Sequence, residues 1–216
     1  RRQRQMCIRD SINIFPFFLF SAINKNSLDN VNPNNDKMFL QCISEYPHCT
    51  DQRSEIWRLF SYSMVHSGIG HLIGNMFGLV FCLMILYRFQ YFRNTIIVYF
   101  VSVINGGLSF YLTNPYDILV GASGGVYGIF GGNIANYIYN NDVMLSGEKC
   151  FLHFFYIVFT VIDISVFFSA RSENVSYQSH WYSLLFGLLT GLSIFKEFRP
   201  VFYKKCIRLI GIILFC

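Results

Sequence analysis

The chain has 216 residues, of which 53% are hydrophobic and 13% charged, with a formal net charge of +5. Typical soluble domains carry about a quarter charged residues, so this composition excludes an ordinary soluble domain. The basic residues form no cluster suited to a phosphate backbone, and we expect no nucleic-acid partner. Seven cysteines follow no metal-ligand spacing, and we expect no metal site.

Apolar segments of about 20 residues recur along the chain, long enough to cross a ~30 Å hydrocarbon core as helices. We therefore predict an all-α protein, a polytopic transmembrane helical bundle with a six-helix core and a partial seventh helix. The predicted helices cover, in chain order, residues 11–24, 69–87, 95–113, 118–139, 151–168, 177–195 and 206–216.

The two outer segments are too short to span a bilayer. We interpret residues 1–10 as a non-native leader, 11–198 as one membrane domain with a truncated first helix, and 199–216 as a basic linker followed by a truncated seventh helix. With the N-terminus inside, alternating spans place most lysines and arginines on the inside, as the positive-inside rule requires. The second, fourth and sixth helices then all begin at the outer face.

Residues 25–66 form the one long polar loop, which this topology places outside. Cys42 and Cys49 lie in it, and a disulfide and two unpaired thiols are equally consistent with their spacing. Trp57 beside Arg58 suits a membrane interface. For His66, near the end of the loop, we favour a solvated histidine over one that lines a water-filled entrance.

Small residues line one face of three predicted helices, which predicts close packing of their backbones. Glycines accompany His71 and Asn75 in the second helix and His180 in the sixth, at spacings of three, four or seven residues. The polar side chains therefore point into the bundle. In the fourth helix, one face is lined by Gly121, Gly125, Gly128, Gly132 and Ala135.

Three polar residues from different helices fall at one membrane depth. His71, Ser123 and His180 are about the third, sixth and fourth residues of helices that start at the same face. A rise of 1.5 Å per residue places them within roughly 5 Å of one another in depth. A small transporter or channel would instead spread polar residues through the membrane. A serine among glycines is commonly a packing residue, but the shared depth favours chemistry.

Serine-based peptide hydrolysis needs a base for the hydroxyl proton and donors for the developing oxyanion. Ser123 and His180 form the minimal pair, and His71 with Asn75, one turn apart on one helix, supplies side-chain donors beside backbone N–H groups. Gly121 allows close backbone approach.

Two further residues extend this candidate site. Tyr127, one turn after Ser123, is placed to stack on His180. Asp163 in the fifth segment is costly in a membrane. Because it lies toward the outer end, we favour hydration from the outer side over a proton relay.

These residues and their spacing resemble the rhomboid intramembrane serine proteases. The matching motifs are Glu55-Ile56-Trp57-Arg58, His71-x-x-x-Asn75, Gly121-Ala122-Ser123-Gly124-Gly125-Val126-Tyr127, and His180 followed by Gly187 and Gly191. The match covers roughly residues 54–198 and is most similar to animal secretory-pathway rhomboids. One departure is Ser183, where the family usually has glycine.

The resemblance implies that Ser123 is the nucleophile, His180 the general base and acid, and His71 and Asn75 part of the oxyanion hole. It implies cleavage of single-span transmembrane proteins near the luminal or extracellular face, without a cofactor. The lipid bilayer and those substrates are the expected partners, in the Golgi, endosome or plasma membrane. The alternative is a catalytically silent rhomboid-like protein that binds client helices for trafficking or degradation.

Overall fold

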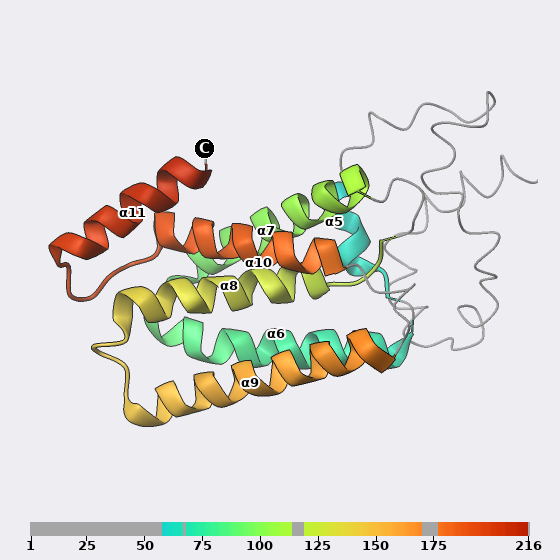
Figure 1. Ribbon diagram of the computed structural model, residues 1–216, viewed down its shortest axis with the longest axis horizontal. Coiled ribbons are helices and arrows are strands. Elements are labelled where there is room, and N and C mark those ends of the chain that lie inside the picture. The colour runs from blue at the N-terminus through green and yellow to red at the C-terminus, as the bar shows by residue number, and fades with distance from the viewer. Residues whose placement is uncertain (1–57, 67, 114–118, 170–176, 216) are drawn as a thin grey trace, which may run out of the picture.

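All regular structure in the described part of the chain is helical, as the sequence predicts. The structure is a computed structural model that describes residues 58–66, 68–113, 119–169 and 177–215 (Figure 1). Its elements are α5 (Arg58–Ser61), the 3-10 helix η1 (Tyr62–Met64), α6 (Ile69–Phe89), α7 (Phe92–Thr113), α8 (Ser123–Asn140), α9 (Ser146–Ser169), α10 (Tyr177–Ile194) and α11 (Phe202–Phe215). The predicted leader, the first helix and the Cys42–Cys49 pair lie outside the described residues.

The second to sixth predicted helices correspond to α6 to α10, and the partial seventh corresponds to α11, which begins at Phe202 instead of residue 206. The clearest errors are two helix starts: the fourth helix is predicted from residue 118 but begins at Ser123, and the fifth is predicted from residue 151 but begins at Ser146. Gly121 has φ +111°, and a right-handed helix cannot pass through that conformation. Ser123 therefore lies in the first turn of α8 instead of one turn inside it.

Helix α8 forms the centre of the bundle and packs against α6, α7 and α10 (Figure 1). Its glycines let the neighbouring helices approach closely. A Cβ atom at Gly128 would lie 2.1 Å from the Ser102 side chain of α7, and one at Gly131 would lie 2.2 Å from the Leu184 carbonyl oxygen of α10. The predicted small-residue face is thus a real packing surface in α8 and α10.

Two of the described helices, α6 and α7, are long and apolar enough to cross a membrane by length and composition. Helix α8 has 18 residues, and most of them are buried. Because protein surrounds α8, its interior-facing positions hold glycines and asparagines instead of the large aliphatic residues that lipid contact favours. A central helix that other helices surround can therefore have a lower hydropathy than a helix that faces lipid.

A second polar cluster lies at the end of the bundle away from Ser123. The amide of Gln90 donates to Asn136 Oδ1 at 2.8 Å, and Asn140 Nδ2 donates to the Lys196 carbonyl oxygen at 2.9 Å. Asn94 Nδ2 donates to the Ile194 carbonyl oxygen at 3.1 Å. The sequence predicts that, apart from Asn105, polar residues of the helices gather at one depth. This second cluster contradicts that prediction, because the carbonyl groups at the end of α10 also need hydrogen-bond donors.

Helix α9 lies beside α6 (Figure 1). Large aromatic side chains form its contacts with α6 and α8. The Phe155 ring stacks on Phe81 of α6 with centroids 5.5 Å apart, and Phe159 lies 5.4 Å from Phe130 of α8. Side chains of this size hold helix axes apart, unlike the glycine contacts between α8 and α10. The α9 contact therefore differs in kind from the close contacts of the central helices.

Helix α11 is attached to the bundle by buried charge. Lys204, with 2% of its side chain exposed, donates to Asp142 Oδ1 at 3.2 Å. Desolvation opposes ionisation of Asp142, yet the Lys204 ammonium holds the pKa of that carboxyl below its usual range. Arg208 reaches the Phe195 carbonyl oxygen at 2.9 Å. These contacts join α11 to the loop after α8 and to the end of α10.

We predict that Gly187→Ala lowers the free energy of unfolding by about 1–3 kcal/mol, the usual cost of overpacking. A Cβ atom there would lie 2.1 Å from the Gly128 carbonyl oxygen, and a backbone atom cannot rotate away. Unfolding in detergent micelles measures the change. Gly74→Ala is the matched control, because nothing in the described structure lies within 4 Å of the added atom. Equal stability of both variants would contradict the prediction.

Candidate active site

Ser123 and His180 come together where α8 and α10 begin. Ser123 is the first residue of α8 and His180 the fourth of α10, and both helices start at the same end of the bundle. Ser123 Oγ lies 2.9 Å from His180 Nε2. A hydroxyl at this distance from an imidazole nitrogen is within reach for proton transfer. The structure therefore brings together the two residues that the sequence singles out.

The His180 ring is held by aromatic contact. Tyr127 of α8 stacks on it with ring centroids 4.2 Å apart and planes 12° from parallel. Tyr177 packs edge-on from the preceding turn, 6.1 Å away. His180 Nδ1 is buried with no hydrogen-bond partner in the described structure. The arrangement is thus a serine–histidine pair whose ring is oriented by stacking, without a carboxylate on its second nitrogen.

Asp163 is linked to this site through Tyr127. Its side chain is half-buried on α9 and interacts with the Tyr127 hydroxyl. Phe159, one turn earlier on α9, packs edge-on against the Tyr127 ring at 5.3 Å. Helix α9 therefore contacts the far side of the ring that stacks on His180, and both roles considered for Asp163 from sequence stay predictions.

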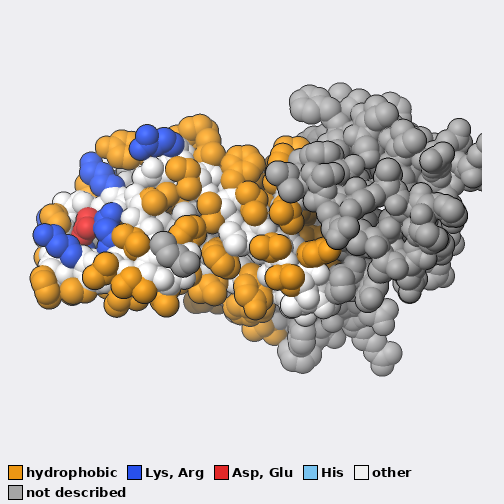
Figure 2. Space-filling view, turned by 90° about the horizontal axis from the view of Figure 1, so that it is seen from above, with side chains coloured by type: hydrophobic (Ala, Val, Ile, Leu, Met, Phe, Trp, Pro, Cys, Tyr) orange, Lys and Arg blue, Asp and Glu red, His pale blue; other side chains and the backbone are white. Residues whose placement is uncertain are grey.

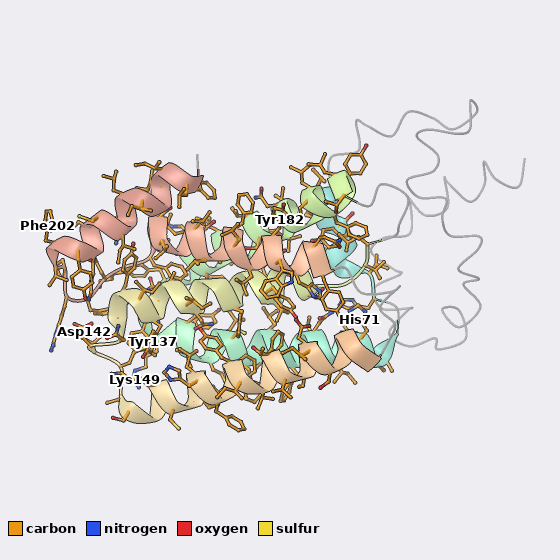
Figure 3. All side chains as sticks on the ribbon, viewed as in Figure 1. His71, Tyr137, Asp142, Lys149, Tyr182 and Phe202 are labelled. Carbon is orange, nitrogen blue, oxygen red and sulfur yellow. The ribbon has the colours of Figure 1, made fainter. Side chains whose placement is uncertain are left out.

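His71, Asn75 and Gly121 form the other side of the site. Figure 3 shows His71 at the end of the bundle where α10 begins. A Cβ atom at Gly121 would lie 2.8 Å from His71 Nε2 and 3.4 Å from Asn75 Nδ2, so both side chains lie against its backbone. Asn75 is 8% exposed, and its Nδ2 has no hydrogen-bond partner in the described structure. The Asn75 amide is therefore an available donor beside Gly121, which lies two residues before Ser123 in the sequence.

His66 was misread from the sequence. It is not a solvated loop residue, because only 5% of it is exposed. Its Nε2 accepts a hydrogen bond from the Ala122 backbone N–H at 3.3 Å, and its ring packs edge-on against His71 with centroids 5.2 Å apart. The five-residue spacing from His71 is the one sequence signal that connects His66 to the site.

Tyr62 is a residue that sequence reasoning missed. Its carbonyl oxygen accepts a hydrogen bond from the Gly121 N–H at 3.1 Å, and its hydroxyl donates to the Val103 carbonyl oxygen of α7 at 2.8 Å. Together with His66, it holds the segment before Ser123 by two consecutive backbone N–H groups. The sequence does not signal this role, because the bond to Gly121 uses the backbone carbonyl of Tyr62 and depends on where η1 lies.

Comparison with known proteins shows the class to which this fold and site belong. The model of the rhomboid domain matches residues 53–197. The chain belongs to the rhomboid family, and the family together with the apolar helices points to an integral membrane protein.

Similar curated proteins come from animals and bacteria. Rhomboid-related protein 2 of Mus musculus is 29% identical over 74% of this chain and 55% of its own length. YdcA of Bacillus subtilis, named as a candidate rhomboid protease, is 29% identical over 67% of this chain and 71% of its own length. Inactive rhomboid-related protein 2 of Caenorhabditis elegans is 27% identical over 68% of this chain and 42% of its own length. The chain spans about half the length of these two animal relatives.

We predict that Gly121→Ala disrupts this side of the site. The new Cβ atom would lie 2.6 Å from His71 Cε1, and φ +111° is a strained conformation for alanine. Strain of this kind costs about 1–3 kcal/mol. Thermal unfolding followed by near-ultraviolet circular dichroism measures the loss. Gly70→Ala, with nothing in the described structure within 4 Å, is the control. A melting temperature unchanged by Gly121→Ala would contradict this account.

Proposed function

We propose that this protein is an intramembrane serine endopeptidase that cleaves single-span transmembrane proteins near the luminal or extracellular face. The 2.9 Å contact between Ser123 Oγ and His180 Nε2 carries the proposal, since it joins two helices within a rhomboid domain. Family membership alone is insufficient support, because one similar relative is named inactive.

The proposed reaction uses Ser123 as the nucleophile and His180 as base and then acid, in successive steps. His180 Nε2 takes the Ser123 hydroxyl proton as Oγ attacks the scissile carbonyl carbon. His180 then gives that proton to the leaving amine as the peptide C–N bond breaks. Water from the outer side attacks the acyl-enzyme, giving a proton to His180, which returns it to Ser123 as the ester bond breaks. No cofactor enters any step.

Charge on the tetrahedral intermediate needs donors that are already in place. We assign this role to His71 and Asn75 with backbone N–H groups at the start of α8. Two observations support it: Asn75 Nδ2 is buried without a partner in the described structure, and Ser123 begins α8, whose first N–H groups have no partner within the helix. Because Gly121 has no Cβ atom, the His71 and Asn75 side chains can lie against its backbone.

The substrate class follows from the location of the site. A transmembrane helix hydrogen-bonds its own carbonyl groups, so a scissile bond must leave the helix before attack. We therefore expect small or helix-breaking residues near the cleavage position. We propose the secretory pathway as the compartment, from the similarity of the motifs to animal rhomboids.

We predict that a fluorophosphonate labels the full chain at one serine. Ser123→Ala abolishes labelling, because the nucleophile is gone. His180→Ala slows it by about 10²–10⁴-fold, the usual contribution of a general base. Labelled protein is quantified by in-gel fluorescence after reconstitution in lipid vesicles. Ser193→Ala is the control, since the hydroxyl of this α10 serine donates to the Leu189 carbonyl oxygen of its own helix, away from Ser123.

Labelling that survives Ser123→Ala would overturn the mechanism. A parallel assay with a co-reconstituted single-span protein separates the two functions considered from sequence. Cleavage that depends on Ser123 supports the protease. Capture of the same protein by wild type and Ser123→Ala alike, with no cleavage by either, identifies a binding protein of the catalytically silent kind and rejects the proposal.

We predict that Asn75→Ala lowers kcat by about 10²–10³-fold with little change in KM, because one oxyanion donor is removed. Initial rates of cleavage of the same single-span protein measure both constants. Asn105→Ala is the matched control, since the Asn105 amide donates within α7 to the Val101 carbonyl oxygen. An Asn75→Ala enzyme with unchanged kcat would remove Asn75 from the site.

A further inference from the structure

An open pocket lies between α7, α10 and α11, at the end of the bundle away from Ser123. It has a volume of about 730 Å³, and its lining includes Arg93, Lys196 and Arg208. Glu197 is the one acidic residue of this lining. Glu197 Oε1 is paired with Arg208 at 2.9 Å, so the excess positive charge of the pocket resides on Arg93 and Lys196.

Neither of these two cations has an acidic partner among the described residues. Arg93 forms no ion pair with any described residue. Lys196 Nζ lies 4.7 Å from the Phe198 ring centroid and 5.7 Å from the Tyr91 ring centroid. Away from bulk water, an anion attracts a cation more strongly than the face of an aromatic ring does. The pocket is therefore electrostatically suited to a negatively charged group.

The frame of the pocket is fixed by hydrogen bonds. The Lys196 backbone N–H donates to Gln90 Oε1 at 2.8 Å, and its carbonyl oxygen accepts from Asn140. The Asn94 side chain ties α7 to the Ile194 carbonyl oxygen. The backbone that carries the lysine is thus held in place by the same polar cluster that caps α10.

The depth of the pocket matches a headgroup layer. His180 and Lys196 are separated by 16 residues, about 24 Å along a helix, so the pocket lies near the opposite membrane face from the candidate active site. Figure 3 shows Asp142 and Lys149 at this end and His71 at the other. Figure 2 shows lysine and arginine side chains gathered at the same end. The positive-inside rule places such an end toward the cytoplasmic leaflet, which carries the anionic lipids.

An apolar track leads from the pocket toward the middle of the membrane. Ile97 lines the pocket, and Phe100, Ile104 and Leu108 follow it along α7 at spacings of three or four residues. Each is between 38% and 43% exposed in the described part of the chain. A charged headgroup site that continues into an apolar helix face matches the two parts of a phospholipid.

We propose that this pocket binds the phosphate-bearing headgroup of an anionic phospholipid. Arg93 and Lys196 contact the headgroup, and the acyl chains lie along Ile97, Phe100 and Ile104. A free phosphate would use the same two cations but would gain nothing from the apolar track. The track therefore favours a lipid, and the site is independent of whether Ser123 is catalytic.

The test compares phosphatidylglycerol with phosphatidylcholine on the purified full chain. Native mass spectrometry counts bound lipid, and thermal unfolding in micelles reports its stabilising effect. We expect phosphatidylglycerol to bind at least tenfold more tightly than phosphatidylcholine and to raise the melting temperature. The double variant Arg93→Gln/Lys196→Gln loses this preference. The control Lys149→Gln/Lys205→Gln removes equal charge at the same end outside the pocket lining and keeps it.

Equal binding of the two lipids by the wild-type chain would overturn the proposal whether or not the double variant folds. So would an unchanged preference in the double variant, or its equal loss in the control, which would indicate general charge attraction. Inorganic phosphate is the third probe. If it stabilises the wild-type chain as much as phosphatidylglycerol at the same concentration, the ligand is a free anion and the lipid assignment fails.

Discussion

The close backbone contact between α8 and α10 is the constraint on which the rest of the molecule depends. Gly187 lies so close to the Gly128 backbone that a Cβ atom at position 187 would be 2.1 Å from the Gly128 carbonyl oxygen. Ser123 lies five residues before Gly128, and His180 seven before Gly187, so the contact fixes how far apart the two side chains are at the start of the helices. Larger residues here would separate the axes, and the 2.9 Å contact between hydroxyl and imidazole would be lost. The packing of α8 against α10 therefore also determines the distance between Ser123 and His180.

The segment before Ser123 adds what the helix contact cannot supply. Two helices can set the distance between Ser123 and His180, and in the proposed mechanism the oxyanion donors approach from a third direction. Gly121, at positive φ, turns the chain so that His71 and Asn75 of α6 lie against its backbone. Tyr62 and His66 then hold the N–H groups of Gly121 and Ala122. Those two N–H groups are thereby occupied, and the first N–H groups of α8 beyond them are left for a ligand.

Periodicity and composition predicted most of the fold because membrane helices must satisfy their backbone hydrogen bonds within the segment. The same regularity predicts that His71, Ser123 and His180 lie at one depth. Three features lay beyond it. The start of α8 depends on one backbone torsion at Gly121, the burial of His66 depends on a partner 56 residues away, and the polar cluster around Gln90 and Asn140 depends on where α10 ends. Each of these features depends on tertiary contacts, which the spacing of residues along one helix does not predict.

Ser183 shows how such a requirement can reverse the meaning of a sequence difference. By resemblance to the family, glycine is usual at this position, and a serine there predicts slightly looser packing of α10. In the structure the Ser183 hydroxyl is fully buried and donates to the Ser102 carbonyl oxygen of α7 at 3.0 Å. A Cβ atom at the facing Gly106 would lie 2.0 Å from that hydroxyl. The larger side chain on α10 is therefore accommodated by a glycine on α7, and it gives the two helices a hydrogen bond that glycine would not supply. The small-residue pattern is a property of the facing pair of helices, and one sequence position alone does not determine it.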